Sequence, residues 1–167
     1  SATGSAGTGG RVELLGERVG LLEGATVNVS GQNGGGVALV GGDFQGGNIG
    51  VRNAINTYFS QHASIQADAT NNGDGGRVIV WADDATRAYG QVTSRGGING
   101  GDGGFVEVSG KRYLDFGARV DTQAPFGNTG SLLLDPGAMI IKAGAGSNDL
   151  GGGSFNAGTV SGGTDSG

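Results

Sequence analysis

The residues best able to do chemistry in this chain are carboxylates, because two of them at a suitable separation are the minimum for glycoside hydrolysis. The candidates are Asp83, Asp84, Glu107, Asp115 and Asp121. Glu107 and Asp121 occupy outward positions of alternating apolar segments, where a charged side chain normally faces water. Asp83 and Asp84 follow such a segment at a corner, where aspartate commonly stabilises a turn. The sequence shows no dense cluster of Asp, Arg and Lys like that of a lyase cleft, so we predict a protein that is not an enzyme.

Other chemical sites find little support. His62 is the only histidine and cysteine is absent, so a zinc site is not expected, and no Gly-x-Ser-x-Gly elbow occurs. The phrases at 72–76 and 100–104 are rich in glycine and aspartate, but they lack the aspartate spacing of a calcium-binding nonapeptide. A strand, not the helix that a phosphate-binding loop needs, follows each phrase. We interpret both as tight corners and expect no cofactor; weak adventitious calcium at Asp74 or Asp102 is the alternative.

Four aromatic residues are the candidate contact sites for a ligand. Trp81 and Tyr89 fall in one repeat, and Tyr113 and Phe116 fall in the next. An exposed strip of such rings would stack against sugars of a cell-surface or glycan receptor. The competing interpretation is that the rings shield the flank of the fold or pack its corners.

Composition and charge exclude several classes of protein. Gly accounts for 40 of the 167 residues, and 10 basic residues stand against 15 acidic ones without any basic run. Nucleic acid is therefore not an expected partner. No apolar run approaches the roughly 20 residues that a membrane-spanning helix needs. Glycine that recurs between short Val, Ile and Leu segments favours corners of a repeating all-β fold over a flexible linker.

A glycine followed by strict alternation recurs five times, which indicates half-buried strands. In the clearest copy, residues 103–110, Val106 and Val108 lie on one face, and Phe105 and Glu107 lie on the other. The glycines that open the copies are 25, 41, 28 and 26 residues apart: Gly10, Gly35, Gly76, Gly104 and Gly130. A period in the twenties with one such phrase per repeat indicates a solenoid.

Two further segments recur within the repeat. The second phrase lies at 24–29, 63–67, 90–94 and 117–122, and the third, weaker one is clearest at 19–22 and 113–116. Three short strands per turn joined by glycine corners describe a three-sided coil. The sequence therefore predicts an all-β fold, a parallel β-helix, or β-solenoid, of about five coils.

Stacking the coils predicts two continuous aliphatic ladders inside the solenoid, with a spacing of roughly 4.8 Å. The first ladder contains Val12, Val37, Val78, Val106 and Leu132. The second contains Leu14, Leu39, Val80, Val108 and Leu134.

The repeat divides the chain into three regions. Residues 10–142 form the β-helix, and the long spacing places a lateral insertion of about 14 residues at 46–60. The apolar residues of this insertion have helical spacing, but its many Gly and Asn residues favour an irregular loop. Residues 1–9 and 143–167 are Gly-rich arms that should be mobile unless something, such as a neighbouring subunit, holds them.

Three runs carry a family resemblance: GGRVIVWADD at 75–84, GGDGGFVEVSGK at 100–111, and VDTQAP with GNTGSLLLDP between 120 and 136. They resemble the later β-helical repeats of filamentous-haemagglutinin-like exoproteins of two-partner secretion systems. The resemblance extends over about residues 9–142 and is most specific in the central half. It implies a secreted right-handed β-helix, exported by an outer-membrane partner, that serves as an adhesin, a matrix component or a stalk. The chain has fewer coils than the family and is expected to lack its amino-terminal secretion domain.

Taken together, these observations predict a secreted structural protein at the bacterial surface or outside the cell. The solenoid has no terminal caps, so we expect copies of the chain to pair head to tail as a homopolymer. The alternatives are a passive stalk segment of a large two-partner-secreted adhesin and a carbohydrate-binding or carbohydrate-cleaving β-helix.

Overall fold

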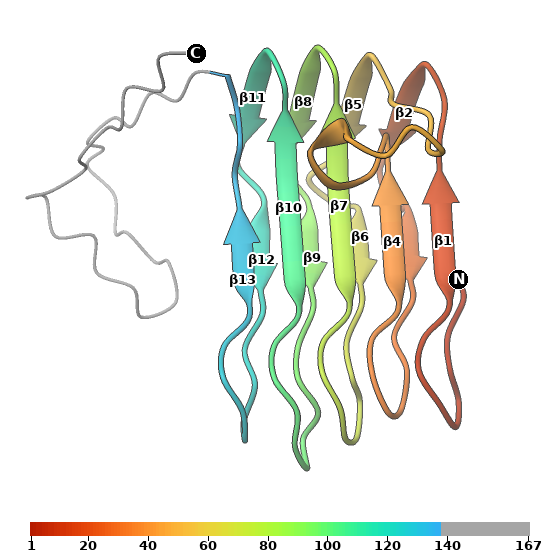
Figure 1. Cartoon of the computed structure of the whole chain (residues 1–167), viewed down its shortest axis with the longest axis vertical. Helices are drawn as coiled ribbons and strands as arrows, with labels where there is room; N and C mark the ends of the chain where they lie inside the picture. The colour runs from red at the N-terminus through yellow and green to blue at the C-terminus, as the bar shows by residue number, and fades with distance from the viewer. Residues whose placement is uncertain (138–167) are drawn as a thin grey trace, which may run out of the picture.

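Three parallel sheets form the fold. The computed structural model describes residues 1–137, which contain thirteen strands and one short 3₁₀ helix (Figure 1). In pairing order, the first sheet contains β1 (Arg11–Leu14), β4 (Val37–Val40), β7 (Arg77–Ala82), β10 (Phe105–Gly110) and β13 (Ser131–Leu133). The second contains β2 (Arg18–Leu21), β5 (Asn56–Phe59), β8 (Ala85–Ala88) and β11 (Tyr113–Phe116). The third contains β3 (Thr26–Asn28), β6 (Ser64–Gln66), β9 (Gln91–Thr93) and β12 (Arg119–Asp121).

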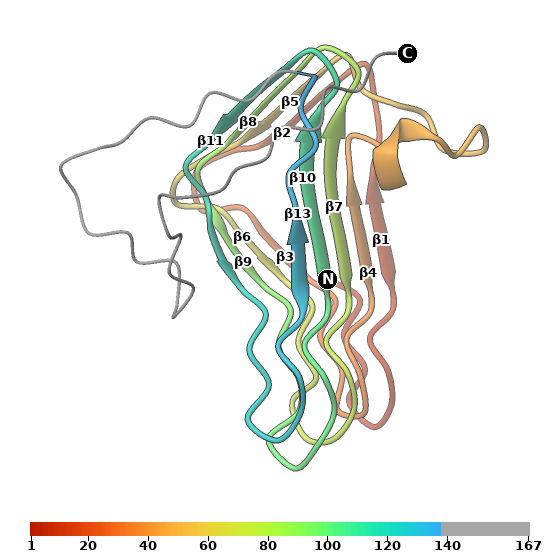
Figure 2. The ribbon, with the colours of Figure 1, turned by 60° about the vertical axis from the view of Figure 1, so that its left-hand side comes forward.

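Each turn of the chain contributes one strand to each sheet. Strands β1–β3, β4–β6, β7–β9 and β10–β12 are four successive coils, and β13 begins a fifth. Neighbouring strands within each sheet are parallel and come from adjacent coils. Figure 2 shows the three sheets around the interior, with long corners between the third and first sheets. The predicted all-β, right-handed parallel β-helix is thereby confirmed.

The glycine before each strand of the first sheet lets one coil lie directly on the next. A Cβ atom on Gly104 would lie 2.1 Å from the Gly76 carbonyl oxygen and 2.1 Å from the Ser94 Oγ atom. No side chain fits there, because the backbone of the preceding coil already occupies the space. This close stacking of backbones explains why glycine recurs at the start of each repeat.

Aliphatic side chains fill the interior as stacked columns. The register aligns Val12 with Ala38 and then with Val78, Val106 and Leu132. The parallel column runs from Leu14 to Val40, Val80 and Val108, and Leu134 packs against the same core. Wholly buried members of this core include Ala38, Val40, Val78, Val80, Val106, Val108, Phe59, Ile65 and Val92.

The two ladders predicted from the sequence were therefore wrong in the second coil. Val37 and Leu39 lie on the outer face of the first sheet, where Leu39 clusters with Ile79 and Trp81. The glycine that corresponds to Gly76 in this coil is Gly36, not Gly35, because Val37 pairs with Arg77. A shift of one residue moves every side chain of a strand to the opposite face.

The lateral insertion lies at 41–55, earlier than predicted. It is an irregular loop with one 3₁₀ turn, η1 (Phe44–Gly46), as the density of glycine and asparagine favoured. Residues 56–59, assigned to the insertion by sequence, form β5, which pairs with β2 and β8. The apolar spacing that suggested a helix includes Phe59, which points into the core and is wholly buried.

Residues 1–9, which were predicted to be mobile unless something holds them, are held by the first coil of the same chain. The Ala2 and Gly4 amides donate hydrogen bonds to the Asn28 and Ser30 carbonyl oxygens at 2.8 and 2.9 Å. Gly4 also forms a parallel bridge with Gly31. The small side chains of this segment suit the same kind of stacked corner that later coils repeat. The predicted arm at 143–167 lies outside the described residues, as do 138–142 of the predicted β-helix.

Candidate functional site

The inserted loop covers the outer face of β4, β7 and β10 and builds the main candidate site. Gly41 and Gly42 begin it with φ angles of 80° and 159°. A Cβ on Gly41 would lie 2.2 Å from the Thr57 Oγ1 atom and 2.2 Å from the Trp81 carbonyl oxygen, so only glycine allows the chain to leave the coil here. Asp43 then accepts a hydrogen bond from the Phe44 amide and begins the 3₁₀ turn.

Trp81 anchors the loop. Its side chain is 4% exposed, because the loop glycines Gly42 and Gly46 pack against the indole ring. The indole Nε1 donates to the Asp83 Oδ1 atom at 3.0 Å, and Asn53 bonds both that carboxylate oxygen and the Gly46 carbonyl. The loop is thus fixed to the sheet by an aromatic contact and a connected set of hydrogen bonds.

Glu107 lies under the same loop and is wholly buried. It faces outward from β10, as predicted, but the interpretation of a solvated charge was wrong, because the loop from the second coil covers it. The Gln45 amide donates to both carboxylate oxygens at 3.2 Å. Burial raises the pKa of Glu107, while the hydrogen bonds from Gln45 and Ser109 oppose that rise.

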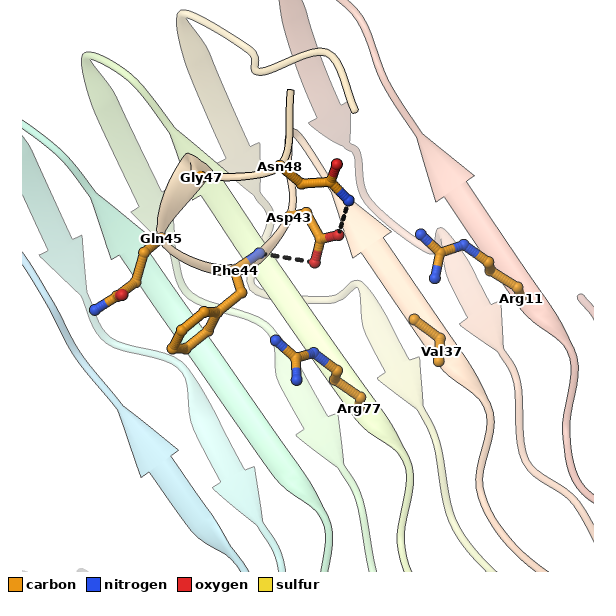
Figure 3. A pocket seen from close by; sticks show the side chains of 8 residues that line it. All are labelled: Arg11, Val37, Asp43, Phe44, Gln45, Gly47, Asn48 and Arg77. Carbon is orange, nitrogen blue, oxygen red and sulfur yellow. Dashed lines mark hydrogen bonds between the residues drawn. The ribbon is translucent and has the colours of Figure 1, made fainter. Parts of the chain in front are cut away.

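Between the loop and the sheet lies an open pocket of about 610 Å³. Figure 3 shows Arg11 and Arg77 on either side of Val37, with Phe44 and Asp43 above them. The guanidinium of Arg77 lies 5.1 Å from the centre of the Phe44 ring and 5.2 Å from that of Phe105. The pocket therefore combines two cations with an apolar floor.

Asp43 supplies the negative charge of this pocket. Burial disfavours its ionised form, but hydrogen bonds from Asn48 and Phe44 and the charges of Arg77 and Arg11 outweigh burial. The pKa of Asp43 consequently lies below its ordinary value. Since Arg11 also pairs with Glu13, much of the pocket's charge is already compensated within the protein.

The four aromatic residues predicted as a contact strip do not form one. Trp81 is buried under the loop, and Phe116 points into the core. Tyr113 is 49% exposed on the outer face of the second sheet, where Arg87 lies 5.6 Å from its ring centre. Tyr89, at the corner after β8, packs edge to face against Tyr58 with ring centres 6.1 Å apart.

The candidate carboxylates do not converge on a catalytic pair. Glu107, Asp115 and Asp121 lie on the first, second and third sheets respectively. Each of the five candidates has a partner within residues 1–137: Asp83 with Trp81, Asp84 with Arg112, Glu107 with Gln45, Asp115 with Tyr89, and Asp121 with the Gln123 amide.

Residues 1–137 contain no group of three or more His, Cys, Asp or Glu side chains placed to hold a metal ion. No helix among these residues is long and apolar enough to cross a membrane. His62 lies at a corner, as predicted, and its Nδ1 atom contacts the carboxylate of Glu23 at an exposed position.

Sequence reasoning missed the residues that line the pocket. Arg11 and Arg77 are aligned in register with Val37 between them, so the repeat itself contained the signal that these cations share one face. Phe44 and Asp43 could not be assigned, because they belong to an irregular loop whose path over the sheet has no periodic signature.

Comparison with known proteins relates this β-helix to a secretion domain. No known family's sequence profile matches the chain, and neither does any curated protein. Among solved structures, the chain is similar to the crystal structure of the HMW1 secretion domain from Haemophilus influenzae, with 30% sequence identity and a TM-score of 0.60. The match covers 80% of this chain and 35% of that chain, so the sequence spans about a third of the matched structure.

Proposed function

We propose that the chain is a non-enzymatic structural module of a secreted filament, matrix or adhesin, and that copies of it join head to tail. The β-solenoid fold and the likeness to a secretion domain support a secreted role. The carboxylates that would have to perform hydrolysis instead bond other groups of the protein or lie on separate sheets. The sequence resemblance to filamentous-haemagglutinin-like exoproteins of two-partner secretion favours the same class.

The observation that carries this proposal is the open end of the coil stack. Strands β1, β2 and β3 are the outermost strands of their sheets. Residues 2–4 pair with the end of β3, the corner that follows it and Gly10, and β1 and β2 have no further strand beside them on this side among the described residues. The first core residues, Val12 and Leu14, are only half-buried. Val78 and Val80, which occupy the same two columns two coils further along the stack, are wholly buried. An unpaired strand edge above an incompletely covered core is suited to receive another coil.

The far end of the described residues has matching properties. Strands β11, β12 and β13 end their sheets, and Leu132 in β13 is 37% exposed. Because all the strands are parallel, one end of the stack is complementary in direction to the other. A heterologous contact between the two ends repeats without closing and yields a filament.

The test is self-association of the intact chain. Sedimentation velocity over a wide concentration range should show a ladder of growing species, and electron microscopy should show filaments one solenoid wide. Leu15 and Leu22, which are 37% and 65% exposed in the first coil, provide the variant. Replacing both with Lys should weaken association, because the added charges would lie on the outermost coil, against which the next copy would stack.

Ile49→Lys is the matched control, since Ile49 is fully exposed at the tip of the inserted loop, away from the stack ends. A chain that remains monomeric at high concentration would overturn head-to-tail assembly. So would a double Lys variant that still assembles like the native chain.

The second candidate function is a passive stalk segment of a larger secreted adhesin. It is favoured by the match to only 35% of the length of a longer chain. In this case the open ends would be covered by further coils of the same polypeptide. Monomeric behaviour of the isolated chain, together with coils encoded on either side of it in the full gene, would support this function over self-assembly.

A further inference from the structure

A second groove crosses the corner between the second and third sheets, on the side of the solenoid away from the inserted loop. It has a volume of about 580 Å³ and extends over three successive coils. Tyr58 and Gln61 come from the second coil, Tyr89 and Gln91 from the third, and Arg119 from the fourth. Residues distant in sequence are thus aligned along the stack by the repeat.

The groove has an aromatic wall with a fixed geometry. Tyr58 is 42% exposed, and its ring meets that of Tyr89 edge to face at an interplanar angle of 66°. The Tyr89 hydroxyl donates to the Asp115 Oδ2 atom at 2.6 Å, which holds this ring in place. A Cβ on Gly117 would come within 3.2 Å of the Tyr89 ring, so the glycine corner keeps the ring accessible from the fourth coil.

The polar groups of the groove are available to a ligand. Within residues 1–137, the side chains of Gln61 and Gln91 form no hydrogen bond, and Arg119 has no carboxylate within 4.0 Å. Each amide can both donate and accept, which suits vicinal hydroxyl groups. The planar guanidinium binds a carboxylate through two parallel hydrogen bonds.

We propose that this groove binds an acidic carbohydrate. An extended sugar chain would place the apolar face of one ring against the exposed Tyr58 ring, its hydroxyls would bond Gln61 and Gln91, and a carboxylate further along it would bind Arg119. A tyrosine offers such a ligand an apolar body with a polar tip, and these residues lie on three successive coils, in the order that a chain running along the stack would meet them. This proposal deepens the adhesin function proposed above by naming a class of ligand. It rests on that function only for the place where the chain would meet the ligand, outside the cell.

This arrangement differs from the pocket under the inserted loop, where Asp43 already accompanies the two arginines. At the corner groove the carboxylates of Asp115 and Glu23 bond Tyr89 and His62, and neither forms an ion pair with Arg119. Arg119 is therefore the cation of this groove that a ligand carboxylate could bind.

The experiment is binding of the purified, labelled chain to an array of immobilised uronic-acid and sialic-acid glycans beside their neutral counterparts. The native chain should retain the carboxylated sugars and discriminate against the neutral ones. Arg119→Gln should remove that discrimination and lower affinity about tenfold or more. Tyr58→Ala should weaken binding by a similar factor, while Tyr58→Phe, which keeps the ring, should bind like the native chain.

Two variants control for surface changes. Tyr113→Ala removes another half-exposed tyrosine on the same sheet, and Arg112→Gln removes another exposed arginine, and both lie outside the groove. Both should bind the acidic glycans normally. The proposal is overturned if no acidic glycan is retained, or if Tyr58→Ala and Arg119→Gln bind as the native chain does. Because self-association is measured separately by sedimentation, failure of glycan binding would leave the assembly proposal standing.

Discussion

The backbone N–H of Gln45 donates to both carboxylate oxygens of Glu107, at 3.2 Å each, across 62 residues of sequence. Gln45 belongs to the loop that leaves the second coil, and Glu107 lies on β10 in the fourth. The Gln45 side chain extends the connection to Asp135, whose Oδ2 atom lies 3.0 Å away. The inserted loop therefore ties together coils that otherwise contact only their immediate neighbours.

This relationship makes stability depend on pH through Glu107. Burial raises its pKa in the folded state, so the folded chain holds the proton more tightly than the unfolded chain does. The resulting stability is fully present below the ordinary value of 4.5 and is lost as the pH rises through the folded pKa. Glu107→Gln keeps an acceptor oxygen but cannot ionise, so its stability relative to the native chain should increase from about pH 4 to pH 8.

Urea unfolding at several pH values measures the difference. Glu13→Gln is the matched control, because Glu13 occupies the same outward column of the first sheet but is exposed. Its stability should keep a nearly constant offset from that of the native chain. Parallel pH profiles for the native chain and Glu107→Gln would contradict the prediction.

Trp81 should be the main anchor of the inserted loop. Trp81→Ala removes a ring that is 4% exposed and leaves a cavity between the loop and β7, so we expect a loss of about 3–5 kcal/mol in the free energy of unfolding. The freed loop should also be cut faster by trypsin at Arg52. Denaturant unfolding and timed proteolysis measure both effects.

Tyr113→Ala provides the comparison, because this exposed residue should change stability by only about 0.5 kcal/mol. If Trp81→Ala unfolded at the same denaturant concentration as Tyr113→Ala, the loop would not depend on the indole for its position.

The fold could be predicted from the sequence because the same strand phrases recur. Alternation in 103–110 and a nearly fixed offset between phrases, broken only where the loop is inserted, are consequences of stacking similar coils. The register of the second coil could not be predicted in the same way. Three glycines precede Val37, and Val37–Val40 is apolar on both faces, so alternation does not distinguish inside from outside.

The reason for this ambiguity is the inserted loop itself. By covering the outer face, it makes Leu39 and Ile79 buried on the side that normally faces water. The same cover hides Glu107 and Trp81, which the sequence suggested would be accessible. The aromatic contact site failed for a related reason: Tyr58 was assigned to the insertion, whereas it lies on β5 beside Tyr89.

The corrected register can be tested with two adjacent substitutions. Ala38 is wholly buried in the inner column, whereas Val37 lies half-buried on the outer face. Ala38→Asp places a carboxylate in the core without a partner, which costs on the order of several kcal/mol and should prevent folding at neutral pH. Val37→Asp should remain folded, with a much smaller loss of stability.

Circular dichroism and thermal unfolding of the two variants distinguish the registers. The register predicted from Gly35 would reverse the outcome, so that Val37→Asp unfolds and Ala38→Asp does not. Equal effects of both substitutions would contradict the alternation of faces in β4.

The Tyr89–Asp115 hydrogen bond should be visible in a spectrophotometric titration. The bond and the nearby carboxylate charge both favour the neutral phenol, and they raise the pKa of Tyr89 to about 12 from an ordinary value of 10.0. In a variant in which Tyr58 and Tyr113 are replaced by Phe, Tyr89 is the only tyrosine left. Its phenolate absorption should therefore rise near pH 12.

Adding Asp115→Asn should move the transition down towards 10, because the amide carries no charge. Asp84→Asn is the control and should leave the transition unchanged. A titration that is insensitive to Asp115→Asn would show that this carboxylate does not fix the Tyr89 ring, and with it the aromatic wall of the corner groove.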